Sequence, residues 1–200
     1  MHISDGILNP EICLAGYAGA IVLTGLVLKK TKEKDIPKIS LMGAAFFVSS
    51  LIHIKIGMVS VHLTLLGILG IILGTQAIPA IIVGLFFQAL MFGHGGITTL
   101  GINSLIFSIP AIFAHYIFIV ASKRIKNITI ISLTAASASM FAVIIASLLV
   151  LLVIYFSGEE FAGIAYLFSL SNALLAFVEG FITFFIIRQI LTIKPDMLKR

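Results

Sequence analysis

Residues 128–156 read ITIISLTAASASMFAVIIASLLVLLVIYF, a run without a single charged side chain. A transmembrane helix needs about 20 predominantly apolar residues, and this run is longer than that. Alanine and serine recur along it, and such small residues allow helices to approach closely in lipid, where packing drives their association. The stretch therefore predicts a membrane-spanning helix that packs against neighbouring helices.

The rest of the chain has the same character. Of its 200 residues, 60% are hydrophobic and 10% are charged, and the mean hydropathy is +1.21, whereas a soluble domain has about 25% charged residues. We predict an all-α integral membrane protein with about seven transmembrane helices, forming one substrate-binding domain over residues 1–200. The predicted segments are Glu11–Leu28, Ile39–Ile54, His62–Gly74, Pro79–Phe92, Asn103–Ser122, Ile128–Phe156 and Ile164–Leu191. The third and fourth are short, so a helical hairpin that reaches only part-way is the alternative there.

The basic residues predict the orientation in the membrane. Twelve of the thirteen lie in the connection that follows the first segment, in the one that follows the fifth, or at the C-terminal end. With seven spans these three regions face the same side, and Lys55 alone faces the other. The positive-inside rule then places the N-terminus outside and the C-terminus in the cytoplasm. The expected location is the inner, cell membrane of a prokaryote.

Several classes of function are excluded by the residues. The net charge of +5 is spread between apolar runs, so it does not form a basic face for nucleic acid. Cys13 is the single cysteine, which excludes an internal disulfide and thiolate metal clusters. The chain contains no HExxH, P-loop or GxSxG motif. We therefore expect no enzyme and no organic cofactor, and any active transport must draw energy from a partner or an ion gradient.

Four of the five histidines cluster on the predicted outer side. These are His2, His53, His62 and His94, whereas His115 falls inside the fifth segment and is interpreted as a packing residue. Imidazole suits cobalt, nickel, copper and zinc. The start Met1-His2, which we expect to be the mature start, offers an α-amine, an amide nitrogen and an imidazole to one ion. A further imidazole would complete a planar set of four nitrogens, although the residues alone leave open whether His2 is an incidental terminal residue.

Three other polar groups stand out. Asp5-Gly6 is a turn dipeptide that could hold the terminal segment, residues 1–10. His94-Gly95-Gly96 reads as an outer loop that polar neighbours such as Thr98 and Asn103 could fold over a cavity, with an ordinary connection as the alternative. Glu179 is a carboxylate deep in a predicted helix, where an unpaired charge costs about 2.5–3.5 kcal/mol or more. It is expected to be neutral, paired or turned towards a polar cavity.

These motifs resemble a known family. Met1 to Gly6, MHISDG, is similar to the M-H-I-x-[DE]-G start of the membrane-embedded substrate-binding component of cobalt/nickel energy-coupling-factor transporters. Residues 88–103, QALMFGHGGITTLGIN, resemble its QALxxxHGG[LI]TTLGAN, with Ile102 in place of alanine. Residues 60–64, SVHLT, and 179–183, EGFIT, resemble its S-x-H-[LP]-T and E-G-x-[IL]-T elements. The family often has histidine seven residues before the final-helix glutamate, where this chain has Asn172.

The resemblance implies a metal site and partners. Met1 would supply its amine, His2 its amide and ring, and His62 the fourth nitrogen, while residues 93–103 around His94 shield the site. The transported substrate would be Co²⁺ or Ni²⁺, and His94 favours cobalt because nickel members often have D-G-G there. A transmembrane coupling subunit, two cytoplasmic ATPase subunits and a possible small accessory membrane subunit would complete an importer serving, for cobalt, cobalamin biosynthesis. A stand-alone channel or gradient-driven carrier is the alternative, and an intramembrane metalloenzyme is disfavoured.

Overall fold

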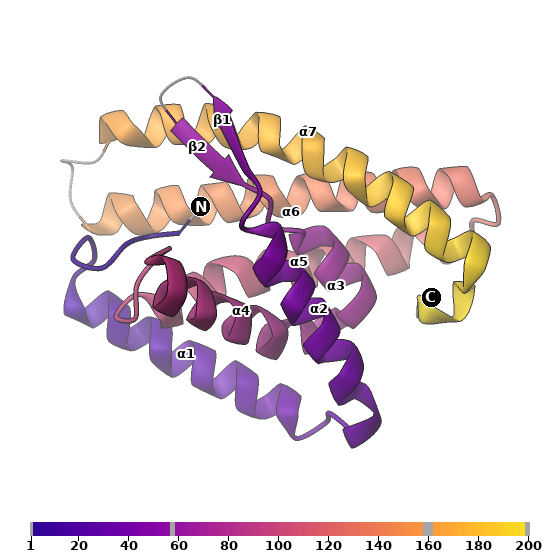
Figure 1. Ribbon diagram of the computed structural model, residues 1–200, viewed down its shortest axis with the longest axis horizontal. Coiled ribbons are helices and arrows are strands. Elements are labelled where there is room, and N and C mark those ends of the chain that lie inside the picture. The colour runs from indigo at the N-terminus through magenta and orange to yellow at the C-terminus, as the bar shows by residue number, and fades with distance from the viewer. Residues whose placement is uncertain (1, 57–58, 158–161, 199–200) are drawn as a thin grey trace.

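The computed structural model describes residues 2–56, 59–157 and 162–198, which form a helical bundle with one small hairpin (Figure 1). The helices are α1 (Pro10–Leu28), α2 (Ile36–Ser49), α3 (Leu66–Leu73), α4 (Ala77–Phe92), α5 (Leu100–Ser122), α6 (Ile128–Ser157) and α7 (Ala162–Ile193). Short 3-10 turns are η1 (Glu33–Asp35), η2 (Gly74–Gln76) and η4 (Pro195–Met197). Each of the seven predicted apolar segments overlaps one of these helices, so the prediction of a mostly helical chain is confirmed.

The all-α prediction misses a two-stranded antiparallel hairpin. Strands β1 (His53–Ile56) and β2 (Val59–His62) pair so that His53 lies opposite His62. The predicted helix through Ile54 is therefore wrong, because α2 ends at Ser49, and His62 closes a strand instead of opening a helix. β-branched residues alternate with other side chains here, and this pattern fits a pleated strand better than a helix.

α3 and α4 are separate helices that fold back on each other. With eight and sixteen residues, they are about 12 and 24 Å long. The imidazole of His62, just before α3, nevertheless lies with its centroid 6.1 Å from that of His94, just after α4. The reversal occurs at η2, where Gly74 has a φ of +61°, a conformation that glycine adopts without steric cost. This hairpin brings two distant histidines to one end of the bundle.

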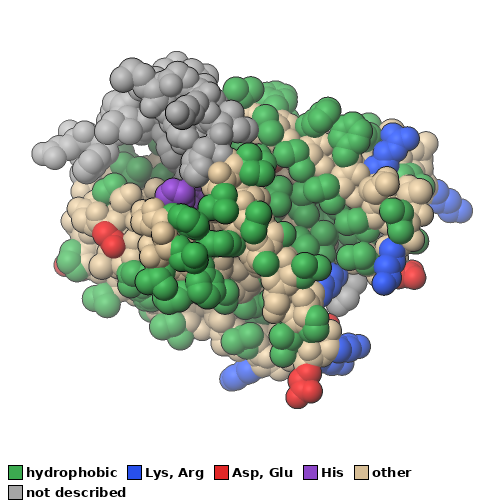
Figure 2. All heavy atoms as spheres, viewed as in Figure 1, with side chains coloured by type: hydrophobic (Ala, Val, Ile, Leu, Met, Phe, Trp, Pro, Cys, Tyr) green, Lys and Arg blue, Asp and Glu red, His purple; other side chains and the backbone are tan. Residues whose placement is uncertain are grey.

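The described residues contain five stretches that are long and apolar enough to cross a membrane. They are Pro10–Leu28, Leu66–Phe92, Leu100–Ser122, Ile128–Ser157 and Ser171–Ile193. Large apolar side chains are exposed along α1, α6 and α7, and Figure 2 shows how they cover the visible face. Such a surface needs lipid as its solvent. The chain is thus a multi-pass membrane protein, while seven spans and the orientation of the termini remain predictions.

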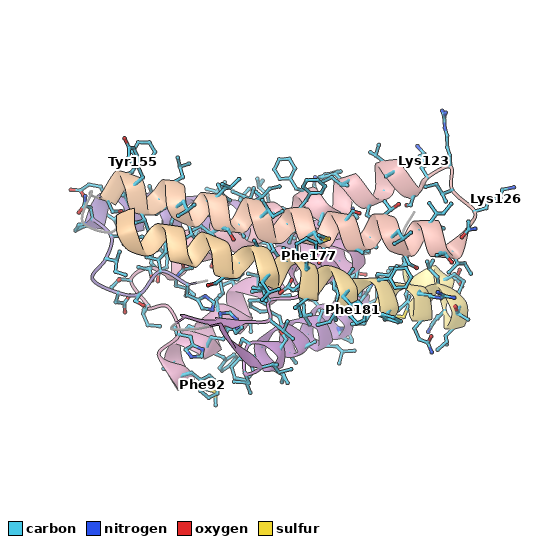
Figure 3. All side chains as sticks on the ribbon, turned by 90° about the horizontal axis from the view of Figure 1, so that it is seen from above. Phe92, Lys123, Lys126, Tyr155, Phe177 and Phe181 are labelled. Carbon is cyan, nitrogen blue, oxygen red and sulfur yellow. The ribbon has the colours of Figure 1, made fainter. Side chains whose placement is uncertain are left out.

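The two ends of the bundle differ in chemistry. Lys123 and Lys126 lie at one end of α5 and α6, whereas Phe92, next to the His94 loop, lies towards the other (Figure 3). On the face shown in Figure 2, the basic side chains gather away from the visible histidine. A basic end opposite a histidine-bearing end is the arrangement that the charge pattern predicts.

Close helix contacts depend on glycine. A β-carbon on Gly16 of α1 would lie 2.8 Å from the α-carbon of Ile102 in α5, and one on Gly70 of α3 would overlap the carbonyl of Ala111. Small residues at such crossings allow backbones to touch, which is how helices associate in lipid. The close α1–α5 crossing at Gly16 holds the start of α1, and with it the N-terminal segment, against the start of α5.

Candidate metal centre

Three imidazoles gather at the end of the bundle where the N-terminus lies. His2 and His62 have ring centroids 4.7 Å apart with planes only 9° apart, and His94 lies 6.4 Å from His2 and 6.1 Å from His62. They come from the N-terminal segment, the end of β2 and the loop after α4. The structure thus brings together three of the four histidines that were predicted to cluster.

The tautomer of His62 is set by its backbone. Its Nδ1 lies 3.2 Å from the carbonyl oxygen of Leu63, and because a carbonyl can only accept, Nδ1–H is the donor. In a neutral ring the lone pair is then on Nε2. A histidine that binds a metal through one nitrogen commonly donates the other N–H to a carbonyl in this way. His62, with 5% of its surface exposed, is thus oriented as a ligand would be.

The two ring nitrogens of His2 lack hydrogen-bond partners among the described residues. Both nitrogens are buried, although buried polar atoms are normally satisfied. Burial lowers the pKa of His2 well below 6.5, and nearby positive groups that include His62 and His94 lower it further. The ring is therefore kept neutral, which is the form that binds a metal ion.

The N-terminal segment is fixed by the start of α5. Ile3 N–H donates to Oδ1 of Asn103 at 3.0 Å, and Nδ2 of Asn103 donates back to the Ile3 carbonyl at 2.9 Å. The Thr99 hydroxyl donates to the same carbonyl at 2.8 Å. The side chain of Ile3 is buried in the core with 2% exposed. Asn103 thus pairs with this backbone as a neighbouring strand would, and His2 is held one residue away.

Asp5 makes a second anchor on the same loop. Its carboxylate accepts hydrogen bonds from the N–H groups of Ile97, Thr98 and Thr99 at 3.2, 3.0 and 3.4 Å, and from the Thr98 hydroxyl at 2.5 Å. The Thr98 hydroxyl and these amides lower the pKa of the Asp5 carboxyl below 3.8. A carboxylate here also complements the positive end of α5. The predicted role of Asp5 in holding the terminal segment is confirmed.

The two glycines after His94 leave room for this segment. A β-carbon on Gly95 would lie 3.2 Å from the β-carbon of His2, and one on Gly96 would overlap the Asp5 carboxylate. Gly95 also has a φ of +78°, which disfavours any other residue. The predicted loop of residues 93–103 ends in the first turn of α5, because this helix begins at Leu100. Its residues 95 and 96 lie directly against the N-terminal segment.

Glu179 of α7 holds the turn that follows His62. It is completely buried, and its Oε1 accepts hydrogen bonds from the Thr64 hydroxyl at 2.6 Å, the Leu65 N–H at 3.0 Å and the Thr64 N–H. These donors lie at the first turn of α3, where N–H groups lack helical partners. Leu65 itself has a φ of +50°. Glu179 is therefore a structural partner of the His62 segment.

Two predicted ligands cannot be placed. Met1 lies outside the described residues, and so does the side chain of His53, although its backbone pairs with His62. Within the described ranges no three His, Cys, Asp or Glu side chains converge as ligands of one ion. His115 is half-buried and lines a cavity of about 290 Å³ with Lys30 and Gln76, as expected for a residue outside the site.

Sequence reasoning did not single out two residues beside the site. The ring of Phe107 lies 5.1 Å from that of His2 with the planes 11° apart, and it is fully buried. Phe107 follows Asn103 by one helical turn, so the i, i+4 spacing on α5 could have revealed it. Gln88 is also fully buried, with both side-chain polar atoms unpartnered among the described residues, and no sequence pattern beyond its motif marks it.

Comparisons with known proteins identify the family of the chain. Residues 2–197 match the model of the family described as cobalt uptake substrate-specific transmembrane region. The chain is 34% identical to a cobalt transport protein of Thermosediminibacter oceani, over 92% of this chain and 81% of that one. It is 35% identical to a fused nickel transport protein of Rhodobacter capsulatus, over 52% of this chain and about a third (32%) of that longer protein.

A solved structure, a truncated transition metal transporter, has the same fold. The TM-score is 0.72, with 22% sequence identity over 96% of this chain and 99% of that one. At this identity the likeness concerns the fold alone. The family match covers nearly the whole chain and includes the described motifs, so this protein belongs to the family of cobalt uptake substrate-specific transmembrane proteins.

Proposed function

We propose that this protein, a cobalt/nickel transport component by its family, captures a divalent ion at the outer face for ATP-driven import. The observation that carries the proposal is the near-parallel pair of His2 and His62, with centroids 4.7 Å and planes 9° apart. Two imidazoles bound side by side in one square plane, with metal–nitrogen bonds near 2 Å, would have centroids about 4–5 Å apart. The observed spacing fits this arrangement.

The proposed ligands are four nitrogens. The α-amine of Met1, the amide and Nδ1 of His2 and Nε2 of His62 would surround the ion, which gives a partner to Nδ1, one of the two buried ring nitrogens of His2 that lack one in the described structure. Three of the four come from consecutive backbone and side-chain atoms, so they form chelate rings. Planar four-nitrogen sets suit Ni²⁺ and Cu²⁺, and low-spin Co²⁺ accepts them.

The choice between cobalt and nickel rests on His94. Its ring lies about 6 Å from both proposed ligands, at 6.4 and 6.1 Å, and it occupies the shielding position at which the nickel branch often has aspartate. This favours cobalt, although the nitrogen set alone binds Ni²⁺ more tightly. Competition binding of the two ions tests the preference, which is wrong if nickel wins and deletion of the protein leaves cellular cobalt uptake unchanged.

Energy would come from partner subunits. The family resemblance suggests a transmembrane coupling subunit and two cytoplasmic ATPase subunits, and the charge pattern suggests that the lysine-rich end faces them. The N-terminus would then be outside. A stand-alone carrier makes the opposite prediction, namely metal flux into liposomes that contain this chain and no ATPase subunits. Absence of flux without the partners, and flux with them and ATP, supports the importer.

The decisive experiment compares two purified forms. One begins at Met1 and carries any tag at the C-terminus, and the other has two extra residues before Met1. Equilibrium binding of Co²⁺ and Ni²⁺ is expected for the first form only, because the extension converts the amine into an amide. If both bind equally well, the amine is not a ligand, and the site must be built from His53, His62 and His94.

A further inference from the structure

The short helix α3 is held by the hydrogen bonds of one polar side chain at each end. All eight of its residues, Leu66–Leu73, are buried. At its first turn Glu179 accepts the hydrogen bonds of Thr64 and Leu65. At its last turn Nζ of Lys38 donates to the carbonyl of Ile72 at 2.9 Å. A hydrogen-bond acceptor at the start of a helix satisfies N–H groups that lack helical partners, and a positive charge at its end complements the helix dipole.

The sides of α3 are closely packed as well. A β-carbon on Gly67 would overlap Ser139 of α6, and one on Gly70 would overlap the backbone of Ala111 in α5. The other six residues of the helix are aliphatic and at most 6% exposed, so they pack against neighbouring elements. The hydrogen bonds made by Glu179 and Lys38 add directional contacts at the two ends, and these help to fix the axial register of the helix.

Lys38 also binds a segment far along the chain. The same Nζ donates to the carbonyl of Met197 at 3.2 Å, and the side chain of Leu198 is buried with 5% exposed. The C-terminal segment 194–198 therefore packs beneath the end of α3 that lies away from His62. One ammonium group connects this segment, α2 and α3.

We propose that Lys38 is a positioning residue for the metal site, acting through α3. By fixing the axial position of this helix, Lys38 and segment 194–198 keep His62, four residues before Leu66, beside His2. Displacement of the segment, for example by a subunit docking at this end, would let α3 shift and weaken the hold of His62 on the ion. The inference rests on the proposed function and adds a route from the lysine-rich end to the metal site.

The test measures metal affinity and dissociation rate in variants of Lys38. Lys38→Met removes both hydrogen bonds and should raise the Kd for the preferred ion by about tenfold, mainly through faster dissociation. Lys38→Arg keeps a donor and should restore most of the affinity. Lys34→Met is the matched control, because Lys34 is an exposed lysine of the neighbouring turn η1, and it should bind like the unaltered protein.

A second variant removes residues 195–200. It should weaken binding in the same direction, and combined with Lys38→Met it should add little, because both changes break one linkage. Binding is measured below the melting temperature of each variant, so that unfolding is not mistaken for loss of the contacts between Lys38, α3 and segment 194–198. If the unaltered protein binds the ion and Lys38→Met has the same Kd and dissociation rate, the inference about Lys38 is wrong, whereas the proposed function stands. Failure of the unaltered protein to bind either ion overturns the proposed function as well.

Discussion

Glu179 accepts a 2.6 Å hydrogen bond from the hydroxyl of Thr64, a residue 115 positions earlier and only two after His62. The bond is buried, and Glu179 also accepts the two N–H groups that open α3. A carboxylate in the last helix thus determines the path of the chain immediately after a proposed ligand. Its cost of burial is offset by three donors, one of them a hydroxyl.

Replacing this carboxylate should therefore affect the site and the fold together. Glu179→Ala leaves buried donors without an acceptor, at about 1–3 kcal/mol for each unsatisfied group, so we expect a lower melting temperature and weaker metal binding. Glu179→Gln keeps one oxygen acceptor, so its melting temperature and metal affinity should lie between those of the unaltered protein and those of Glu179→Ala. Glu11→Ala, at an exposed acid in the first turn of α1, should change neither quantity, and an equal Kd in Glu179→Ala would contradict the assigned role.

A methyl group on Gly96 should displace the N-terminal segment. Its β-carbon would overlap the Asp5 carboxylate, so Gly96→Ala is expected to break the Asp5 anchor and to weaken metal binding by about tenfold or more. Gly25→Ala is the control, because nothing lies within 4 Å of its added β-carbon. Isothermal binding measurements compare the two, and equal loss in both would point to a general effect of the substitution.

The anchor at Asp5 has a defined dependence on pH. The pKa of this carboxyl is lowered from 3.8 by its hydrogen bonds to Thr98 and to neighbouring amides. Its contribution to stability is therefore complete above pH 3.8 and is lost as the pH falls through the lowered value of the folded state. The melting temperature of Asp5→Ala should lie below that of the unaltered protein by the same amount at about pH 5 and pH 7. A difference that vanishes at pH 5 would disprove the lowered pKa.

Alanine variants of three histidines distinguish proposed ligands from a packing residue. His62→Ala removes a proposed donor and should weaken binding strongly, and His2→Ala should be at least as severe because it also opens a chelate ring. His115→Ala should leave binding intact, since His115 lines a different cavity near Lys30. Equilibrium dialysis with Co²⁺ decides the ranking. Loss of binding in the His115 variant with retention in the other two would exclude the proposed site.

Much of the fold was predictable because lipid imposes a simple rule on composition. Long apolar runs indicated all seven helices, and α1, α5 and α6 begin and end within three residues of the predicted bounds. The β1–β2 hairpin was not predicted, because only four residues pair on each side. The alternating β-branched residues on either side of Gly57 were the available signal.

The site was predictable in part. The histidines and Asp5 carry recognisable chemistry, so they could be singled out, and the structure brings His2, His62 and His94 together. The partners of Glu179 could not be found, because a backbone N–H has no sequence signature and Thr64 resembles any other threonine. Phe107 could have been found from its i, i+4 spacing to Asn103, whereas Gln88 required the positions of the helices, which determine which faces meet.

The anchoring of Ile3 by Asn103 has a consequence for biosynthesis. Ile3 finds its hydrogen-bond partner 100 positions later along the chain, and Thr64, two residues after His62, pairs with Glu179 in the final helix. The first contact can form only after about half of the chain has been made, and the second only after nearly all of it has. The surroundings of the histidine cluster are thus completed only when α7 is in place.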